Sequence, residues 1–407
     1  MRHQNSVLHS VLTSMPWGVF DRAVAAHDAD KHVRRLPTRT QFIALLYGQL
    51  SGAASLRALV SSFASHAQRL YHLGARPVAR SSLADANAHR PEAVFSAVFA
   101  ALVAQAHWRL ARRMAECVLL IDSTTLRLSR LSENWARFSA DLCGVKAHVV
   151  YDPTADRPTY LAVTPQRTND ITAAQAMPIQ PGATYVFDLG YYDYGWWAML
   201  DQAGCRIVTR LKSNTPFERV EDRPVPPGSS ILSDRTGYLP KRLAASRRNP
   251  MPGLVREIRV IIETGKVLRI FANDLNASAQ EIADLYKRRW AIELFFRWVK
   301  QTLKISHFFG TSENAVRIQI TIALIAFLLL RLAHDASKIV ASPLTFAALI
   351  RTNLMQRREI NELLKPPPTP KHRQSTFDFG PHATRAARRR RDHRAATVNR
   401  ATLEKAA

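Results

Sequence analysis

Five short runs of β-branched and other apolar residues, interrupted by two amphipathic segments, constrain the fold of this 407-residue chain more than any other feature. Each run has the length and composition of a strand; the runs cover residues 117–122, 144–152, 159–164, 184–188 and 205–211. The interrupting segments, "NDITAAQAM" and "YYDYGWWAMLDQAG", have helical patterns. Three strands in close succession predict a meander, and strands alternating with helices predict a parallel flank. The sequence therefore predicts an α/β domain with a mixed five-stranded sheet.

Two aspartates follow apolar runs within this predicted sheet. Asp122 comes after "VLLI" and Asp188 after "YVF", so each is expected at the end of a strand, where sites form in α/β sheets. A single aspartate in such a place is more often a turn residue or a helix cap. Together with an acid on a nearby helix, however, the two would make a carboxylate site suited to Mg²⁺ or Mn²⁺. Two such ions about 3.5–4 Å apart can support an in-line phosphoryl displacement.

The segment "YKRRWAIELFFRWVKQTLK", residues 286–304, supplies that acid. On a helix at 100° per residue, one arc of about 80° holds Tyr286, Arg289, Glu293, Arg297, Lys300 and Lys304. A separate stripe, predicted to face the core, holds Ile292, Phe295, Phe296, Val299 and Leu303. The helix therefore presents one glutamate among cations.

This arrangement has two interpretations. Glu293 could pair with Arg289 and Arg297 on a solvated face, where such pairs stabilise a helix by roughly 0.2–0.5 kcal/mol each. Alternatively, Glu293 binds a metal ion, while Arg289 and Lys300, about 16 Å apart along the helix, hold a DNA backbone on either side of it. Trp290 offers a ring for a displaced base, or packs against a neighbouring part of the fold.

The charge of the chain points to a polyanionic partner. Lys and Arg number 57 against 32 Asp and Glu, giving a net charge of +25, so nucleic acid is the first candidate and an anionic membrane surface the second. The most apolar stretch, residues 318–333, is shorter than the roughly 20 residues of a membrane span and predicts a buried helix. Three scattered cysteines predict neither disulfides nor a zinc site. We expect a cytoplasmic, nucleoid-associated protein without a membrane partner.

The remaining sequence predicts four regions. Residues 1–115 read as a helical DNA-binding domain, because short helices with a break at Gly52 suggest a helix-turn-helix, although many helical bundles share that pattern. A short helix capped by serine is expected from about residue 80 to Pro91. Residues 116–335 form the catalytic domain, with a β insertion at about 213–275 that is irregular up to 253 and then forms a hairpin. A helical segment, 336–365, and a basic disordered tail, 366–407, follow.

The spacing of Tyr286, Arg289, Glu293 and Lys300 resembles the Y-R-E-K signature of bacterial insertion-sequence transposases of the IS-four type. The upstream segments "IDSTT", "FDLGYYD" and "TRLKSN" resemble the same family, and the last adds Arg210 and Lys212 to the expected DNA contacts.

The resemblance implies an RNase-H-like fold with an all-β insertion, and a DDE site of Asp122, Asp188 and Glu293 that binds two divalent ions. It implies cleavage at the terminal inverted repeats of the element and strand transfer into target DNA by a homodimer, with Tyr286, Arg289 and Lys300 at the DNA end.

One departure concerns the hairpin that relatives with this signature form at the DNA end. A relative of this kind wedges a tryptophan from its β insertion into the hairpin, whereas residues 206–285 contain no Trp and offer Phe217 or Tyr238 instead. Two other functions use the same features: a nuclease of this fold that does not join strands, and a transposon-derived DNA-binding protein that has lost catalysis.

Overall fold

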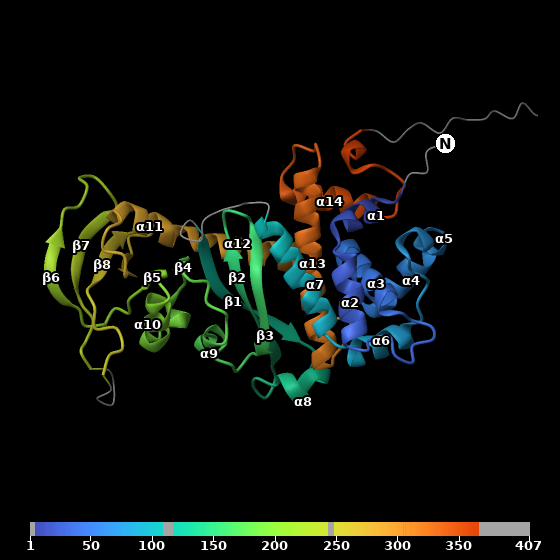
Figure 1. Cartoon of the computed structure of the whole chain (residues 1–407), viewed down its shortest axis with the longest axis horizontal. Helices are drawn as coiled ribbons and strands as arrows, with labels where there is room; N and C mark the ends of the chain where they lie inside the picture. Colours follow the sequence, from blue (N-terminus) through green and yellow to red (C-terminus); the bar gives the residue numbers. More distant parts are fainter. Residues whose placement is uncertain (1–4, 109–116, 243–247, 304, 306, 366–407) are drawn as a thin grey trace, which may run out of the picture. The chain divides into compact units, whose positions relative to one another are not determined.

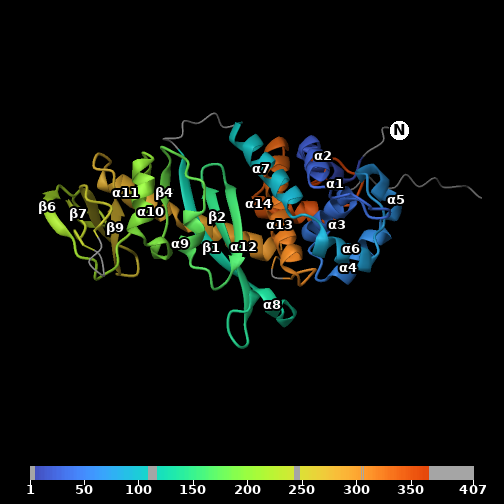
Figure 2. The same ribbon diagram turned by 60° about the horizontal axis from the view of Figure 1, so that its bottom comes forward.

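The computed structural model describes residues 5–108, 117–242, 248–303, 305 and 307–365. An N-terminal helical region is followed by one large β-sheet with helices on both faces (Figures 1 and 2). The predicted disordered tail, residues 366–407, lies outside the described residues. The domain boundaries at residues 115, 335 and 365 stay predictions.

The N-terminal region is helical, as predicted. Its α-helices are α1 (Val7–Val11), α2 (Trp17–Ala26), α3 (Thr38–Ser51), α4 (Leu56–Ser65), α5 (Ala67–Leu70), α6 (Arg80–His89) and α7 (Ala93–Trp108). Helix α3 begins after Pro37 and ends at Gly52, whose left-handed backbone (φ 73°) a glycine adopts without strain. The predicted serine cap of α6 is wrong: the residue before this helix is Ala79, which has no side-chain oxygen to accept a hydrogen bond from the first turn.

Helix α13 (Glu313–Ala336) is the apolar helix that the sequence predicts to be buried. It has 24 residues, more than the apolar run alone indicates, and is the one helix in the described ranges whose length and composition would allow a membrane span. However, 89% of its apolar window is buried inside the protein, where it contacts α3, α6 and α7. These contacts make α13 a core helix. Helix α14 (Pro343–Asn353) packs against it.

The sheet has the order β3-β2-β1-β4-β5-β9-β8-β7-β6. Its strands are β1 (Val118–Leu128), β2 (Cys143–Asp152), β3 (Arg157–Pro165), β4 (Thr184–Val186), β5 (Arg206–Arg210), β6 (Glu218–Arg223), β7 (Ile231–Tyr238), β8 (Val255–Ile261) and β9 (Val267–Ala272). β1 pairs antiparallel with β2 and parallel with β4, and β4 pairs parallel with β5. The mixed five-stranded sheet is therefore confirmed, and four further strands extend it.

Alternate residues of the central strands are buried on opposite faces of the sheet. Val118 and Leu120 belong to the core that includes residues of α11 (Ala279–Arg288), α12 (Trp290–Thr302) and α13. Leu119 and Ile121 belong to the core under α9 (Asp170–Gln175) and α10 (Tyr194–Gln202). Figures 1 and 2 show these two helix layers. Because side chains alternate along a strand, the next residue on the α12 face of β1 is Asp122.

The segment predicted to be irregular, residues 213–253, contains strands β6 and β7, so that prediction is wrong. β6 has the sequence "ERVEDR" and lies at the edge of the sheet with five of its six residues exposed. An exposed, charged edge strand lacks the alternation of apolar and polar residues on which strand prediction rests. The hairpin that follows is confirmed as β8 and β9, with Gly265 (φ 78°) at its turn.

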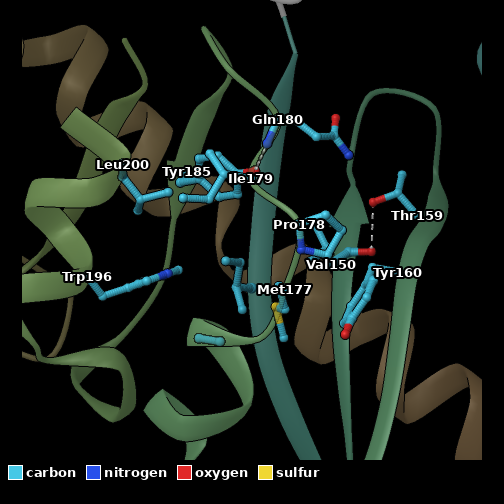
Figure 3. Close-up of a pocket in the computed structure, with 12 residues that line it drawn as sticks. Val150, Thr159, Tyr160, Met177, Pro178, Ile179, Gln180, Tyr185, Trp196 and Leu200 are labelled. Atoms are coloured by element: carbon cyan, nitrogen blue, oxygen red, sulfur yellow. Dashed lines mark hydrogen bonds between the residues drawn. The ribbon is translucent and has the colours of Figure 1, made fainter. Parts of the chain in front are cut away.

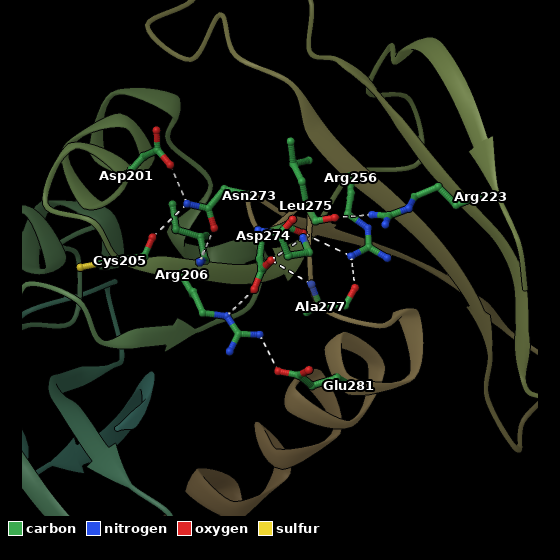
Figure 4. A network of polar contacts seen from close by, with 12 residues as sticks. Asp201, Cys205, Arg206, Arg223, Arg256, Asn273, Asp274, Leu275, Ala277 and Glu281 are labelled. Carbon is green, nitrogen blue, oxygen red and sulfur yellow. Dashed lines mark hydrogen bonds and ion pairs between the residues drawn. The ribbon is translucent and has the colours of Figure 1, made fainter. Parts of the chain in front are cut away.

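A polar network joins the sheet to α11 (Figure 4). Arg206 of β5 pairs with Asp274 at 2.8 Å and with Glu281 of α11 at 2.7 Å. The Asn273 side chain donates to the Asp201 carboxylate at 2.6 Å and accepts from the Ile207 main-chain N–H at 2.7 Å. The start of α11 is therefore tied to the strand that flanks β4.

The single helix predicted for residues 286–304 is divided at Arg289, between α11 and α12. Arg289 keeps right-handed helical dihedral angles (φ −51°, ψ −31°), but the main-chain hydrogen bonds Arg289–Tyr286 and Ile292–Arg289 span three residues instead of four. The apolar stripe is confirmed as buried: Ile292, Phe295, Phe296, Val299 and Leu303.

Gly237 of β7 provides a test of the extended sheet. A Cβ atom at this position would overlap the Glu218 carbonyl oxygen and lie 2.8 Å from a ring carbon of Phe217. We expect Gly237→Ala to lower the free energy of unfolding by about 1–3 kcal/mol, because the backbone of β6 cannot yield as a flexible side chain can. Gly253→Ala is the control, since a Cβ there meets no atom within 4 Å. Urea unfolding measures both, and equal stabilities would contradict the β6–β7 pairing.

Candidate active site

Asp122 lies on β1, and Asp188 lies two residues beyond the end of the parallel neighbour β4. The register pairs Val118 with Thr184 and Leu120 with Val186, so the same offset carried past the end of β4 brings Asp122 beside Asp188. Asp188 caps the short 3-10 helix η5 (Leu189–Tyr191), and its Oδ1 accepts from the Gly190 N–H at 2.8 Å. The prediction that Asp122 ends its strand is wrong, because β1 continues to Leu128 in the antiparallel hairpin with β2.

Glu293 faces these aspartates from the first turn of α12. The Arg289 guanidinium donates to Glu293 Oε1 at 2.6 Å and lies 4.0 Å from Asp122 Oδ2. A single cation thus lies between an acid of the sheet and the acid of the helix. The predicted second pair, Glu293 with Arg297, is absent from the ion pairs of the described residues, so the solvated-face interpretation accounts for only part of this geometry.

The pKa of Asp122 reflects its neighbours. Burial raises this pKa to about 7; the Ser123 N–H, which donates to Oδ1 at 2.7 Å, opposes the rise, and the charges of Asp188 and Glu293 add to it. The Asp122 side chain is 20% exposed. Like charges thus accumulate here, and Arg289 offsets them only in part.

Three other predicted DNA contacts lie near these carboxylates. Tyr286 is buried, and burial raises its pKa; attraction to Arg210 and Arg289 opposes the rise, while the charge of Asp188 adds to it. The Arg289 guanidinium carbon is 6.0 Å from the centre of the Tyr286 ring. Burial lowers the pKa of Lys300, and attraction to Asp122 opposes that shift. The structure therefore brings Tyr286, Arg289 and Lys300 together with the acids, and Arg210 next to Tyr286.

The other predicted contacts lie at the surface. Trp290 is 50% exposed, so the interpretation as ordinary packing is not supported. Arg297 is exposed on α12. Lys212 is exposed after β5, with its ammonium 4.6 Å from the centre of the Tyr192 ring. These side chains are accessible to a large ligand but are not held against the acids.

Sequence analysis missed a polar group on the opposite face of the sheet. Asp170, at the start of α9, accepts hydrogen bonds from Ser123, next to Asp122, and from Lys146 of β2. Asp170 follows a turn instead of an apolar run, so the strand-end criterion could not find it. The β1–β2 pairing, which places Ser123 opposite His148, depends on tertiary structure and cannot be predicted from the local sequence pattern.

A small cavity on the α9 and α10 face is a weaker candidate (Figure 3). It has a volume of about 50 Å³, and the described residues that line it, among them Val150, Tyr160, Met177 and Tyr185, carry no charge. Such a lining suits neither a metal ion nor a phosphate.

The three carboxylates are of a type that binds divalent ions, but in this structure they are too far apart to share one ion. Across the described ranges, no three carboxylate, imidazole or thiol groups lie close enough to share one ion. Arg289 instead lies between Asp122 and Glu293 as the cation. Oxygen donors from two aspartates and a glutamate fit a hard divalent ion once the guanidinium moves.

The raised pKa of Asp122 predicts a pH-dependent stability. In the unfolded chain this carboxyl has a pKa of about 3.9, so the folded state binds the proton more tightly and loses stability as the pH rises from about 4 to about 7. We expect Asp122→Asn, measured by urea unfolding without divalent ions, to stabilise the chain by about 1–3 kcal/mol at pH 8 and by much less at pH 4. An equal effect at both pH values would show that the carboxylate is not destabilised by its surroundings.

Comparisons with known proteins identify the family of the chain. Residues 113–329 match the family model described as "Transposase DDE domain", and residues 3–76 match a domain of unknown function, DUF4372. A Sinorhizobium fredii protein named as the transposase y4zB is 40% identical over 296 residues, which cover 72% of this chain and 82% of that protein. A protein named as a transposase for insertion sequence element IS5377 of Geobacillus stearothermophilus is 31% identical over 56% of this chain and 60% of its own length.

One solved structure aligns with most of the chain. It is the piggyBac transposase in a synaptic complex with hairpin DNA, with a TM-score of 0.45 and 12% identity over 91% of this chain and 84% of that one.

The DDE model covers more than half of the chain, and the S. fredii relative exceeds 30% identity over more than two thirds of it. Membership implies an enzyme that acts on DNA with divalent metal ions, and the IS-four type fits the motifs. The chain belongs to the DDE transposases of bacterial insertion sequences.

Proposed function

We propose that Asp122, Asp188 and Glu293 are the catalytic and metal-binding carboxylates of this transposase, and that they hold two ions, Mg²⁺ or Mn²⁺. The observation that carries the proposal is the convergence of three elements: the β1–β4 register aligns the two aspartates, and Arg289 joins Glu293 to Asp122. The ions, when bound, supply activation of the attacking oxygen and stabilisation of the leaving one.

The protein's own groups then have distinct roles. The carboxylates lie at the end of β4, and α12 brings Glu293 over it, so the reacting phosphate is placed between sheet and helix. Arg289 partly neutralises the acids in the free protein and is released to phosphate oxygens when the DNA and the ions arrive, because a guanidinium binds phosphate as well as carboxylate.

We also assign the DNA end to the surface around these acids. Lys300 and Arg210 are the inner cations, and Tyr286 packs beside Arg289. Trp290, Arg297 and Lys212 are exposed at the rim, where the indole of Trp290 can stack on a displaced base. The reaction needs two element ends, so a homodimer in the synaptic complex and association with the nucleoid complete the proposal.

The two alternatives, a nuclease that does not join strands and an inactive DNA-binding derivative, gain no support from the relatives. Both relatives described above are named as transposases. The three acids are present and lie near one another, although burial and this proximity raise the pKa of Asp122 and so cost stability. A protein that had lost catalysis would have no need to keep such an unfavourable arrangement.

For the N-terminal region we propose that α3 and α4 form a helix-turn-helix that reads duplex DNA at the element end. The helices are bent by 102° across a four-residue turn that begins with the left-handed Gly52. Gly48 of α3 has no Cβ, and the side chain of Leu59 of α4 occupies that space, so the helices pack closely. An angle near 90–120° with a short glycine turn is typical of this motif.

The charge and surface of this motif fit DNA. Residues 31–84 contain eight Lys or Arg and no Asp or Glu. The buried face of α4 holds Leu59 and Phe63, and its exposed face is made of Arg57 and small residues, Ala58, Ser61, Ser62, Ala64 and Ser65. A narrow helix with an arginine in its first turn can enter a major groove, where the first residues of a recognition helix contact base edges.

End cleavage tests the acid assignment. We expect Glu293→Gln and Asp188→Asn to bind a labelled element end as the wild type does, and to lose cleavage by at least about 100-fold in Mg²⁺ on a denaturing gel, because each change removes an anionic ligand. Glu313→Gln is the matched control. Glu313 and Arg317 form an ion pair at 2.6 Å, four residues apart on α13, as Arg289 and Glu293 do, but away from Asp122 and Asp188. If Glu293→Gln cut as fast as Glu313→Gln, Glu293 would be only a salt-bridge partner.

Binding to the element end tests the helix-turn-helix. We expect Arg57→Ala to weaken the affinity of the full chain for the end by about 10-fold and to reduce its preference over a scrambled duplex. Arg22→Ala, on the exposed side of α2, should change the affinity by less than about two-fold. Fluorescence anisotropy at fixed salt measures both. Equal effects of the two changes would move DNA reading away from α4.

A further inference from the structure

Asp170 lies behind the proposed catalytic aspartates, on the face of the sheet that α9 covers. Its Oδ1 accepts from the Ser123 hydroxyl at 2.9 Å and from the Lys146 ammonium at 3.0 Å. Ser123 follows Asp122 directly, and the Ser123 N–H holds Asp122 Oδ1. The Asp170 carboxylate therefore positions Ser123, and Ser123 in turn positions the Asp122 carboxylate.

Asp170 also lies against the turn that carries Asp188. At Gly190, the position that a Cβ would take is 3.1 Å from Asp188 Oδ1 and 3.2 Å from Asp170 Oδ2. Both carboxylates thus approach the same small space, which stays open because residue 190 is glycine. Burial raises the pKa of the Tyr191 hydroxyl, and the charges of Asp122, Asp170 and Asp188 all add to the rise.

Lys146 balances the charge of Asp170. The two side chains are 19% and 23% exposed, so the pair is shielded from solvent. The other basic group nearby, the His148 imidazole, is 3.7 Å from Asp170 and fully buried; burial lowers its pKa to about 4, so it is neutral at pH 7. The positive charge facing Asp170 is therefore that of Lys146.

We propose that Asp170 and Lys146 act as a positioning pair: Asp170 holds Ser123, and with it the adjacent Asp122, in place beside the turn of Asp188, and Lys146 cancels the charge of Asp170, so that the affinity for divalent ions is set by the three catalytic acids. The proposal rests on the function proposed above. Neither residue touches the reacting atoms, and their effect passes through the hydrogen bond to Ser123 and through the charges of the pair. Supporting residues of this kind typically change metal affinity by 10–100-fold.

The charges of the pair predict effects of opposite sign. Asp170→Asn leaves the Lys146 cation uncompensated behind the acids and should weaken Mn²⁺ binding by about 10-fold. Lys146→Met leaves the Asp170 anion uncompensated and should strengthen Mn²⁺ binding by about three-fold. The double variant should return to within about three-fold of the wild type. A merely structural role predicts the same direction for both single changes, since both would loosen the site.

Paramagnetic resonance of free Mn²⁺, titrated into the full chain without DNA, measures these affinities independently of cleavage. Asp28→Asn is the matched control, because Asp28 and Lys31 form an exposed pair at 3.4 Å, and it should leave binding unchanged. Thermal melting shows whether each variant is folded; a variant that unfolds at the titration temperature is replaced by Ser123→Ala, which breaks the same contact without changing charge and should weaken binding by about three-fold.

The outcomes separate this proposal from the one on which it rests. Mn²⁺ binding that Asp188→Asn does not weaken would overturn the catalytic assignment, and the positioning pair with it. Binding that depends on Asp188, but shifts in the same direction in Asp170→Asn and Lys146→Met or in neither, would overturn the positioning pair alone. Opposite shifts that cancel in the double variant would establish it.

Discussion

The parallel pairing of β1 with β4 positions everything else at the site. Because the two strands start together and β4 stops at Val186 while β1 continues, the sheet leaves an opening beside β1 where Asp122 and Asp188 meet. The strands can pair in this way only with both faces covered, since their alternate residues are apolar on both sides. The helix layers that cover those faces bring in the remaining groups: α12 supplies Glu293 on one side, and α9 supplies Asp170 on the other.

Parts of this arrangement could be read from the sequence, and the reasons differ from residue to residue. Strands with strong apolar runs and the buried stripe of α12 depend on local periodicity, so β1 to β5 and Ile292 or Phe295 could be predicted. β6 could not, because an exposed edge strand has no apolar face. The spacing of Arg289 and Glu293 predicted their contact, whereas the break in the helix at Arg289 depends on how two helices meet the sheet. Asp170 reaches the site through β1 and β2, a contact that no local pattern records.

Electrostatic cost explains the two cations at the site. Bringing carboxylates together in a partly buried place is unfavourable, as the raised pKa of Asp122 shows, and a protein retains such an arrangement at the expense of stability. Arg289 reduces the cost on the α12 face, and Lys146 does so on the α9 face. Their environments differ: Arg289 lies between α11 and α12 on the face proposed to bind DNA, while Lys146 is held on the opposite side of the sheet by Asp170 and the Thr168 carbonyl.

Because of this difference, the cation on the α12 face and the cation on the α9 face have different roles. In the function proposed here, the cation on the DNA face exchanges carboxylate for phosphate when DNA and divalent ions bind, which frees the acids to bind the ions. On the same proposal, the cation on the far face keeps its partner Asp170 and does not exchange it for phosphate. The positive chain and the negative site thus have complementary roles in this proposal: cations over the surface attract the polyanion, and a small cluster of acids, partly compensated by neighbouring cations, attracts the divalent ions.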